Sequence, residues 1–122
     1  MSRTFLRSKI HRATVTDKSL DYEGSITLDS LLLEASGILP YEQVHVLNVT
    51  TGARFETYAI VGRAGTGQVC INGAAARLAE KGDIVIIMTY EQRSSPPPRS
   101  WKPTVVRVDA RNRIVRTRKG GR

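Results

Sequence analysis

Short β-branched segments separated by turn residues run along most of the chain and constrain its fold more than any other feature. The segment 55–61 alternates between two faces, as a half-buried strand does, and 44–49 and 68–71 have similar composition. Residues 84–87 form the most apolar run and are predicted to be a central strand buried on both faces. Many short strands with one-turn helices are typical of a closed barrel rather than an open sheet.

Two short helices are predicted between these strands. The first follows Asp29 or Ser30, either of which is a suitable N-cap, and ends at Gly37. The second covers about 74–78. Each helix precedes a glycine turn and another strand, and this similarity suggests a duplicated half. Residues 5–15 mix basic and apolar side chains, as an exposed-edge or inter-subunit strand does.

Length and composition predict one cytoplasmic domain. A chain of 122 residues has the size of a single domain, and no stretch approaches the roughly 20 apolar residues that span a bilayer. The basic N-terminus lacks the apolar core of a signal peptide. The one cysteine, Cys70, cannot form an internal disulfide, and no metal-site motif is present. Its apolar neighbours Val69 and Ile71 predict a buried thiol.

The formal net charge of +8 suggests that the chain binds polyanions. Six of the last twelve residues are basic: Arg111, Arg113, Arg116, Arg118, Lys119 and Arg122. Such a tail is expected to be disordered and to attract polyanions, so the alternative to an enzyme is a small basic nucleic-acid-binding barrel. Aromatic residues make up only 6% of the chain, and no row of them is available for base stacking. Nucleic acid is therefore not the expected partner.

Five blocks of polar and glycine residues carry a more specific signal. They are Lys9-Ile10-His11-Arg12, Tyr22-Glu23-Gly24-Ser25, Asn48-Val49-Thr50-Thr51-Gly52-Ala53-Arg54-Phe55-Glu56-Thr57-Tyr58, Asn72-Gly73-Ala74-Ala75-Ala76 and Gly82-Asp83-Ile84-Val85-Ile86-Ile87. Any single polar residue among them is better explained as an ordinary surface or strand residue. In this order and spacing, over about residues 1–90, the blocks resemble the pyruvoyl-dependent aspartate 1-decarboxylases.

The resemblance implies a fold and an assembly. The fold class is mainly β, a small six-stranded double-psi β-barrel with short helices. Residues 1–92 would form the catalytic barrel, 93–110 an extension packed on it, and 111–122 the basic tail. Family members are homotetramers with sites between neighbouring subunits, which here would contain four copies of each cleaved chain. A partner protein that triggers maturation is compatible with the sequence.

The resemblance also implies a cofactor made from the chain itself. The Ser25 hydroxyl would attack the Gly24 carbonyl, and the resulting ester would eliminate, leaving a pyruvoyl group at residue 25 and a separate chain of residues 1–24. The small glycine before the bond would allow close approach and unusual backbone dihedrals. The ketone would form a Schiff base with the amine of L-aspartate, so that loss of CO2 yields β-alanine for pantothenate and coenzyme A synthesis.

Roles for the remaining site residues follow from the same resemblance. Tyr58 would be the proton donor. Arg54 and Lys9 would bind the two substrate carboxylates. The substrate-binding set is Lys9, His11, Arg54, Thr57, Asn72, Gly73, Ala74 and Ala75, with no metal. In this set Thr57 would stabilise the oxyanion of the Gly24 carbonyl, and His11 has the least defined role.

Overall fold

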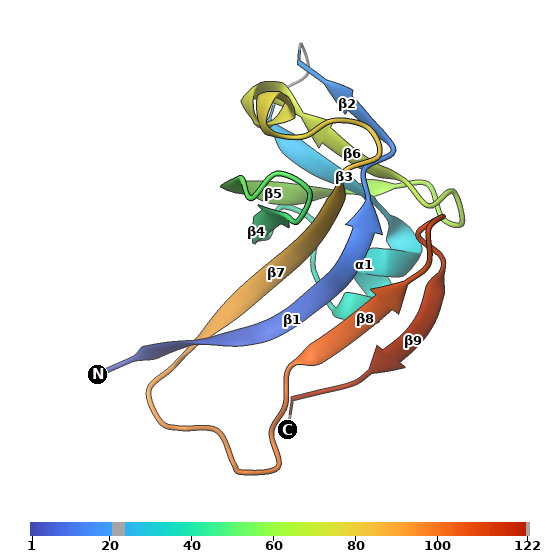
Figure 1. The fold of residues 1–122 in the computed structure, drawn as a ribbon. Coiled ribbons are helices and arrows are strands. Elements are labelled where there is room, and N and C mark those ends of the chain that lie inside the picture. Colours follow the sequence, from blue (N-terminus) through green and yellow to red (C-terminus); the bar gives the residue numbers. More distant parts are fainter. Residues whose placement is uncertain (21–23, 122) are drawn as a thin grey trace.

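The computed structural model describes residues 1–20 and 24–121, which form a strongly curved sheet with one α-helix and one 3-10 helix (Figure 1). The elements are β1 (Arg3–Thr14), β2 (Asp17–Ser19), β3 (Ser25–Asp29), α1 (Ser30–Ser36), β4 (Gln43–Asn48), β5 (Arg54–Gly62), β6 (Val69–Asn72), η1 (Gly73–Leu78), β7 (Ile84–Arg93), β8 (Thr104–Val108) and β9 (Ile114–Arg118). The strand order is β2-β6-β3-β5-β4-β7-β1-β8-β9. The mainly β class is confirmed. The described strands number nine rather than six. No described ladder joins the end strands β2 and β9, so hydrogen bonds between the described strands do not close the sheet into a barrel.

The core lies on one face of the sheet. Val44, Val46, Val85 and Ile87 alternate along two neighbouring strands and are all 0% exposed. Ile86, between two of them, is only half-buried, so the prediction that 84–87 is buried on both faces is wrong. Strand β7 pairs antiparallel with β1 and β4. One face of these strands covers the core, and we call the opposite face the outer face.

Helix α1 follows β3 as predicted. The Asp29 carboxylate accepts a hydrogen bond from the Leu31 N–H at 2.8 Å, and Gly37, at φ 73°, ends the helix in the left-handed region. The same carboxylate accepts from the N–H groups of Gly65 and Gly67. Asp29 therefore fixes the loop 63–67 against the end of β3, the strand that begins with Ser25.

Strand β1 lies inside the sheet, so the prediction of an exposed-edge strand is wrong. It pairs antiparallel with β7 and parallel with β8, because the chain beyond the prolines returns along Ser8–His11. Residues 104–108 form β8, the strand next to β1, and the Trp101 ring contacts Phe5 edge to face with ring centroids 6.2 Å apart.

The basic segment 111–122 is not the loose tail that its charge suggested, since it contains β9, which pairs antiparallel with β8. The turn before β9 is held by Asn112, which is 2% exposed and has φ 61°. Its side chain bonds the Thr14 N–H and carbonyl and the Gly67 carbonyl at 2.7–2.8 Å. The buried contacts of one amide thus order a segment whose composition is typical of disorder. Arg122 lies outside the described residues.

A carboxylate ties β1 and β7 to the turn after α1. Glu42 accepts from Arg7, from the Thr89 hydroxyl at 2.5 Å and from the Leu39 N–H at 2.9 Å. Burial raises the pKa of Glu42, but the bonds from the Leu39 N–H, Thr89 and Arg7 outweigh it, so the net pKa lies below its ordinary value of 4.5. The ionised form is therefore favoured in the folded state.

We expect Glu42→Gln to lower the free energy of unfolding at pH 7 by about 2 kcal/mol, since Arg7 loses its partner charge. Because the folded pKa is lowered, this contribution is present above pH 4.5 and is lost as the pH falls through the folded value. Urea unfolding at pH 7 and at successively lower pH measures it, and the difference between the two proteins should shrink as the pH falls. Glu34→Gln, at an exposed position of α1, is the control, and an equal loss there would contradict the prediction.

Candidate active site

Ser25 has the most unusual backbone among the candidate residues. It is 1% exposed and has φ 151°, a region that is close to glycine-only. A side chain held there costs on the order of 1–3 kcal/mol, which the surrounding structure must balance. The strain lies at the residue whose amide nitrogen belongs to the Gly24–Ser25 peptide bond, so breaking that bond would relieve it.

Gly24 shows neither the close approach nor the unusual backbone dihedral that was expected of it. It is exposed, and no described atom lies within 4 Å of the Cβ that another residue would carry there. The unusual dihedral expected at this glycine is found one residue later, at Ser25. Tyr22, which precedes Gly24 by two positions in the same motif, lies outside the described residues.

Four polar side chains form a square on the outer face of the β3–β6 ladder, and we call them the β3–β6 quartet: Ser25, Thr27, Cys70 and Asn72. Ser25 pairs with Asn72, and Thr27 pairs with Cys70. The Asn72 Nδ2 donates to Ser25 Oγ at 2.9 Å and to Thr27 Oγ1 at 3.0 Å. The Cys70 thiol donates to Asn72 Oδ1 at 3.3 Å. Asn72 is 4% exposed, and both ends of its amide are hydrogen-bonded within the quartet.

The position of Cys70 corrects the prediction of a fully buried thiol. Cys70 is half-buried because it shares the outer side of β6 with Asn72, whereas its neighbours Val69 and Ile71 are 0% exposed and face the core. Burial, and then the charge of Asp17, raise the pKa of the Cys70 thiol. The thiol is therefore protonated at neutral pH and acts as a donor.

Tyr58 lies beside Ser25. Strands β3 and β5 are parallel with Ile26 opposite Ala59, both fully buried, so the preceding residues Ser25 and Tyr58 are neighbours on the outer face. The Tyr58 ring stacks on Tyr41 with centroids 6.3 Å apart. The structure thus brings the predicted nucleophile and the predicted proton donor together.

Thr57, the next predicted residue, lies on the other side of β5. It pairs with Val44, which is 0% exposed, so its side chain belongs to the inward face. Among the described residues no hydrogen bond joins Thr57 to Gly24. In the described residues the contact to the Ser25 hydroxyl comes instead from Asn72.

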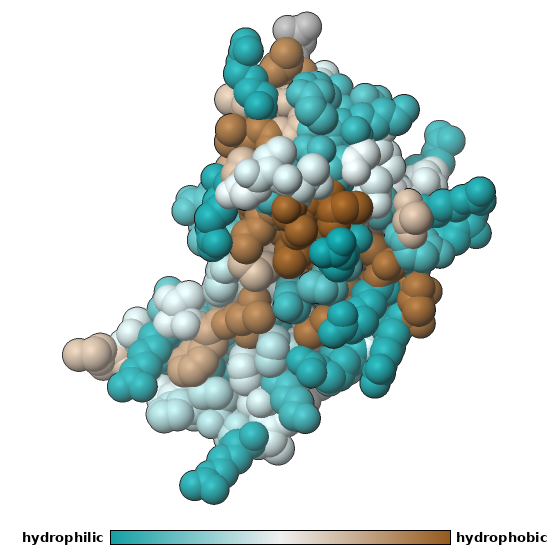
Figure 2. Space-filling model, viewed as in Figure 1, coloured by the Kyte–Doolittle hydropathy of each residue, from teal (hydrophilic) through white to brown (hydrophobic). Residues whose placement is uncertain are grey.

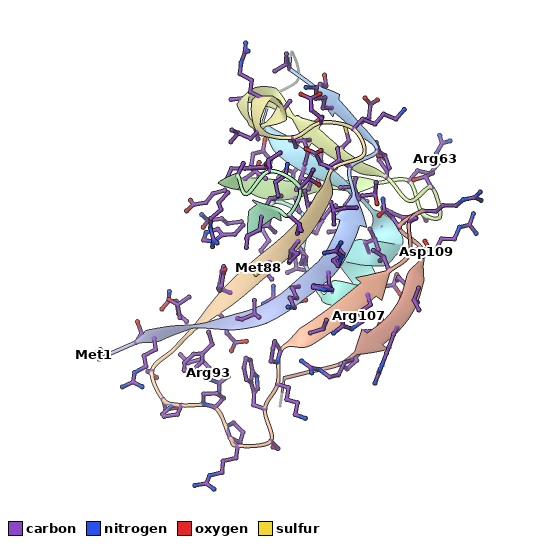
Figure 3. All side chains as sticks on the ribbon, viewed as in Figure 1. Met1, Arg63, Met88, Arg93, Arg107 and Asp109 are labelled. Atoms are coloured by element: carbon purple, nitrogen blue, oxygen red, sulfur yellow. The ribbon has the colours of Figure 1, made fainter. Side chains whose placement is uncertain are left out.

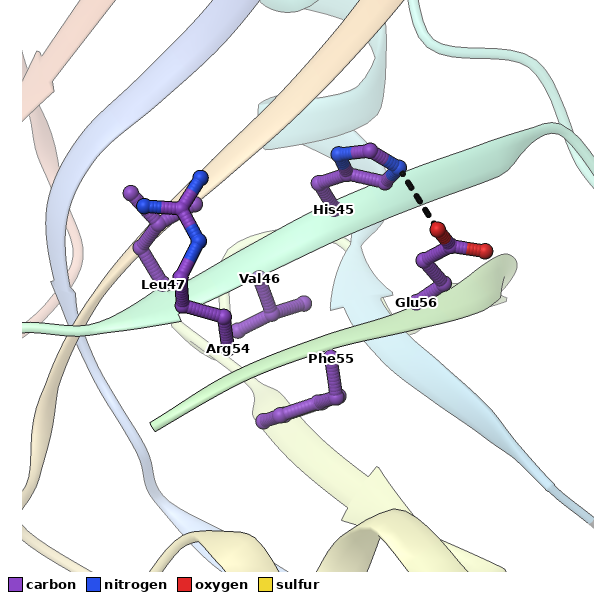
Figure 4. A pocket seen from close by; sticks show the side chains of 6 residues that line it. All are labelled: His45, Val46, Leu47, Arg54, Phe55 and Glu56. Carbon is purple, nitrogen blue, oxygen red and sulfur yellow. Dashed lines mark ion pairs between the residues drawn. The ribbon is translucent and has the colours of Figure 1, made fainter. Parts of the chain in front are cut away.

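Arg54 lines a shallow pocket of about 170 Å³ with residues of both strands of the β4–β5 hairpin (Figure 4). Figure 4 shows Arg54 beside Leu47, its cross-strand partner, and the ion pair between His45 Nε2 and Glu56 Oε1 at 3.3 Å. Arg54 and Tyr58 share the outer side of β5, about 13 Å apart along the strand. The guanidinium is thus on the same face as the quartet but not in its immediate surroundings.

The predicted second short helix is confirmed as the 3-10 helix η1. It begins with Gly73, at φ 71°, directly after Asn72. Asn72 makes no side-chain capping bond to this helix, and its Oδ1, the atom that could accept one, accepts from the Cys70 thiol instead. The first turn, Gly73 to Ala75, thus begins next to the Ser25 hydroxyl.

Lys9 and His11 lie on a strand that is not hydrogen-bonded to β3. They lie on β1, which is four strand positions from β3, or about 19 Å along the sheet. Lys9 pairs with Met88 and His11 with Arg107, and Figure 3 shows Met88 and Arg107 on neighbouring parts of the sheet. Burial and then the charges of Lys9, Arg107 and Arg12 lower the pKa of His11, so it is neutral at pH 7.

Sequence reasoning missed Thr27 and Cys70. A signal was available, because each is two residues from a named site residue on the same strand and therefore on the same face. Without the antiparallel pairing of β3 with β6, however, nothing indicated that these two positions face each other.

Comparison with known proteins decides the family. The family model described as aspartate decarboxylase matches residues 1–115. The chain belongs to this family. The match covers β8 and ends at the second residue of β9, so it extends beyond the region that carries the motifs.

Full-length relatives agree with the family model. The chain is 55% identical to an aspartate 1-decarboxylase of Pelotomaculum thermopropionicum, over 98% of this chain and 91% of the relative. It is 57% identical to one of Corynebacterium efficiens, over 94% and 85%. It is 58% identical to one of Neisseria meningitidis, over 93% and 90%.

Proposed function

We propose that this protein decarboxylates L-aspartate to β-alanine and CO2, using a pyruvoyl group formed from Ser25. The observation that carries the proposal is the buried, strained Ser25 hydroxyl, held by Asn72 directly after Gly24. It occurs in a chain whose relatives at 55–58% identity are named aspartate 1-decarboxylases.

The proposed maturation uses only groups of the chain and water. Ser25 Oγ adds to the Gly24 carbonyl carbon, the C–N bond breaks, and the nitrogen takes the hydroxyl proton, which gives an ester. The Ser25 Cα then loses a proton, the Cβ–Oγ bond breaks, and Gly24 leaves as a carboxylate. Water replaces the nitrogen, which departs as ammonia, so residue 25 ends as a ketone. The strain at Ser25 favours the first of these steps.

The residues present fit such a group, since position 25 is enclosed and faces Tyr58 and Asn72 rather than apolar side chains. A pyruvoyl group supplies a ketone that accepts the substrate amine and takes up the electron pair left when CO2 departs. Tyr58 would hold the proton that the substrate α-carbon then needs. The first turn of η1, residues 73–75, would border the substrate.

The distribution of cationic residues supports a site shared between copies of the chain. Lys9 and His11 lie about 19 Å along the sheet from Ser25. A neighbouring copy that packs on the outer face would bring its β1 to this site. The half-buried Leu47, Ile86 and Met88 give that face apolar contact area, and Figure 2 shows apolar side chains gathered around β4 and β7. We propose a homotetramer with sites of this kind.

The proposed activity places the protein in the cytoplasm, as a source of β-alanine for pantothenate and coenzyme A synthesis. Among the described residues no helix is long and apolar enough to cross a membrane. A separate maturation partner is compatible with this proposal, because Gly24 is exposed.

The test is a mass measurement paired with an assay. Denatured, freshly purified protein is expected to contain two species, residues 1–24 and a pyruvoyl form of 25–122, and the same sample should convert L-aspartate to β-alanine. An uncut chain that stays uncut on prolonged warming, with no β-alanine formed, would refute the proposal.

A second function is favoured by one surface. On the outer face, Arg107 of β8 lies directly opposite Arg116 of β9, and Arg118 lies beside them around a cavity of about 150 Å³. Like charges in directly opposite positions destabilise a sheet. Among the described ion pairs none involves these arginines. A polyanion bound here would relieve the repulsion.

The double variant Arg107→Gln/Arg116→Gln is therefore expected to bind single-stranded DNA at least about fivefold more weakly at low salt, since two phosphate contacts are lost. Self-cleavage should be unchanged, because both arginines lie on β8 and β9, which do not pair with β3. Fluorescence anisotropy with a labelled oligonucleotide measures the binding. Arg63→Gln/Arg99→Gln, at two exposed positions away from this surface, is the equal-charge control. Equal weakening in both variants would mean that net charge, not this surface, governs the binding.

A further inference from the structure

The hydrogen bonds of the quartet run in one direction, toward Ser25. The thiol of Cys70 donates to Asn72 Oδ1, and the Asn72 amide donates onward to Ser25 Oγ and Thr27 Oγ1. A thiol has a single hydrogen to donate, while the carbonyl side of an amide can only accept. The Cys70 thiol thus faces the Oδ1 end of the Asn72 amide, and the Nδ2 end faces Ser25.

We propose that Cys70 is a positioning residue that orients the Asn72 amide so that its Nδ2 donates to Ser25 Oγ during self-cleavage. This inference rests on the proposed function and deepens it. Cys70 does not touch the reacting atoms, so its effect passes through Asn72.

The orientation of this amide matters because Oγ changes its charge during maturation. When the Cβ–Oγ bond breaks, Oγ becomes part of the departing Gly24 carboxylate and gains negative charge. An N–H donor at 2.9 Å, in a site where Ser25 is 1% exposed, stabilises that charge. An amide turned the other way would place its oxygen against Oγ and oppose the step.

Without the thiol, the quartet does not specify one orientation. The hydroxyls of Ser25 and Thr27 can both donate and accept, so they satisfy either end of the Asn72 amide. The Cys70 sulfur is only a weak acceptor, so the thiol favours the acceptor end of the amide, and it lies 3.3 Å from Asn72 Oδ1. Loss of that donor would leave a mixture of productive and unproductive amide orientations.

The test compares the rate of self-cleavage in Cys70→Val and Cys70→Ser. The valine variant keeps the volume without a donor, and the serine variant restores a donor. Newly synthesised chain from a cell-free reaction is followed by gel electrophoresis as it separates into residues 1–24 and 25–122. We expect Cys70→Val to cleave about three- to tenfold more slowly, as the loss of one weak donor predicts, and Cys70→Ser, whose hydroxyl donates but also accepts, to cleave at an intermediate rate.

Two further readouts separate positioning from a general loss of structure. The melting temperature of the uncut chain, measured in a Ser25→Ala background, should be the same for Cys70→Val and Cys70→Ser. The matured valine variant should lose less in kcat for decarboxylation, relative to wild type, than it loses in the rate of self-cleavage. Wild-type cleavage in Cys70→Val, or equally slow cleavage in Cys70→Ser, would overturn the role of Cys70 and leave the proposed function intact. A wild-type chain that never cleaves would overturn both.

Discussion

Replacement of Ser25 by alanine is expected to leave the chain uncut and without decarboxylase activity. The variant lacks the oxygen that must attack Gly24, so neither the break nor the ketone at residue 25 can form. The loss of activity should be at least about 10⁶-fold, the lower end of what enzymes provide over the uncatalysed reaction. Denatured mass should show one species of full length, and the β-alanine assay should give the background rate.

Ser36→Ala is the matched control for this change. Ser36 is also buried, at 2% exposed, but its hydroxyl donates to the Leu33 carbonyl inside α1 and has no contact with the quartet. This variant should cleave and turn over substrate even if it loses some stability. Decarboxylation by an uncut Ser25→Ala protein would remove the pyruvoyl mechanism altogether.

The second large effect is expected from Tyr58→Phe, which should cleave normally and decarboxylate about 10²–10⁴-fold more slowly, the range for loss of one positioned proton donor. Phenylalanine keeps the stacking on Tyr41, so the hairpin should stay in place. The loss is expected in kcat rather than in KM, because the hydroxyl acts after the substrate is bound. Denatured mass establishes cleavage, and initial rates over a range of aspartate concentrations separate the two constants.

Tyr41→Phe tests whether the stacked pair as a whole, or the Tyr58 hydroxyl alone, is required. Tyr41 is 78% exposed. Its replacement by phenylalanine removes the hydroxyl from the other ring of the stacked pair. Nearly wild-type turnover is expected. If both variants lost activity equally, the role of Tyr58 would be structural rather than that of a proton donor.

The local parts of the fold could be predicted because their signals are short-range. Asp29 and Gly37 mark the ends of α1 through bonds within a few residues, and alternation identified β5. The place of β1 inside the sheet could not be predicted, because it depends on a parallel strand whose residues pair with positions 96 residues earlier. The order in β9 depends on Asn112 reaching Thr14 and Gly67, which composition does not reveal.

In the site, too, the local features could be predicted and those that depend on strand pairing could not. The motifs named Ser25, Tyr58 and Asn72, and the structure places these three together. They could not indicate that the strained dihedral falls on Ser25 rather than Gly24, since this follows from the pairing of β3 with both β5 and β6. Cys70 belongs to the same site only through that pairing.

The place of β1 between β7 and β8 bears on the fate of the peptide released by a break after Gly24. A strand of twelve residues that is hydrogen-bonded on both sides, with Ile10 and Ala13 fully buried, cannot leave without dismantling the sheet. The 24-residue piece would therefore remain as a permanent subunit, which denaturant separates and native chromatography does not. Residues 1–24 and 25–122 made as two polypeptides should then reassociate into this fold, yet remain inert, because residue 25 would start as an ordinary serine amine with no acyl bond left to rearrange.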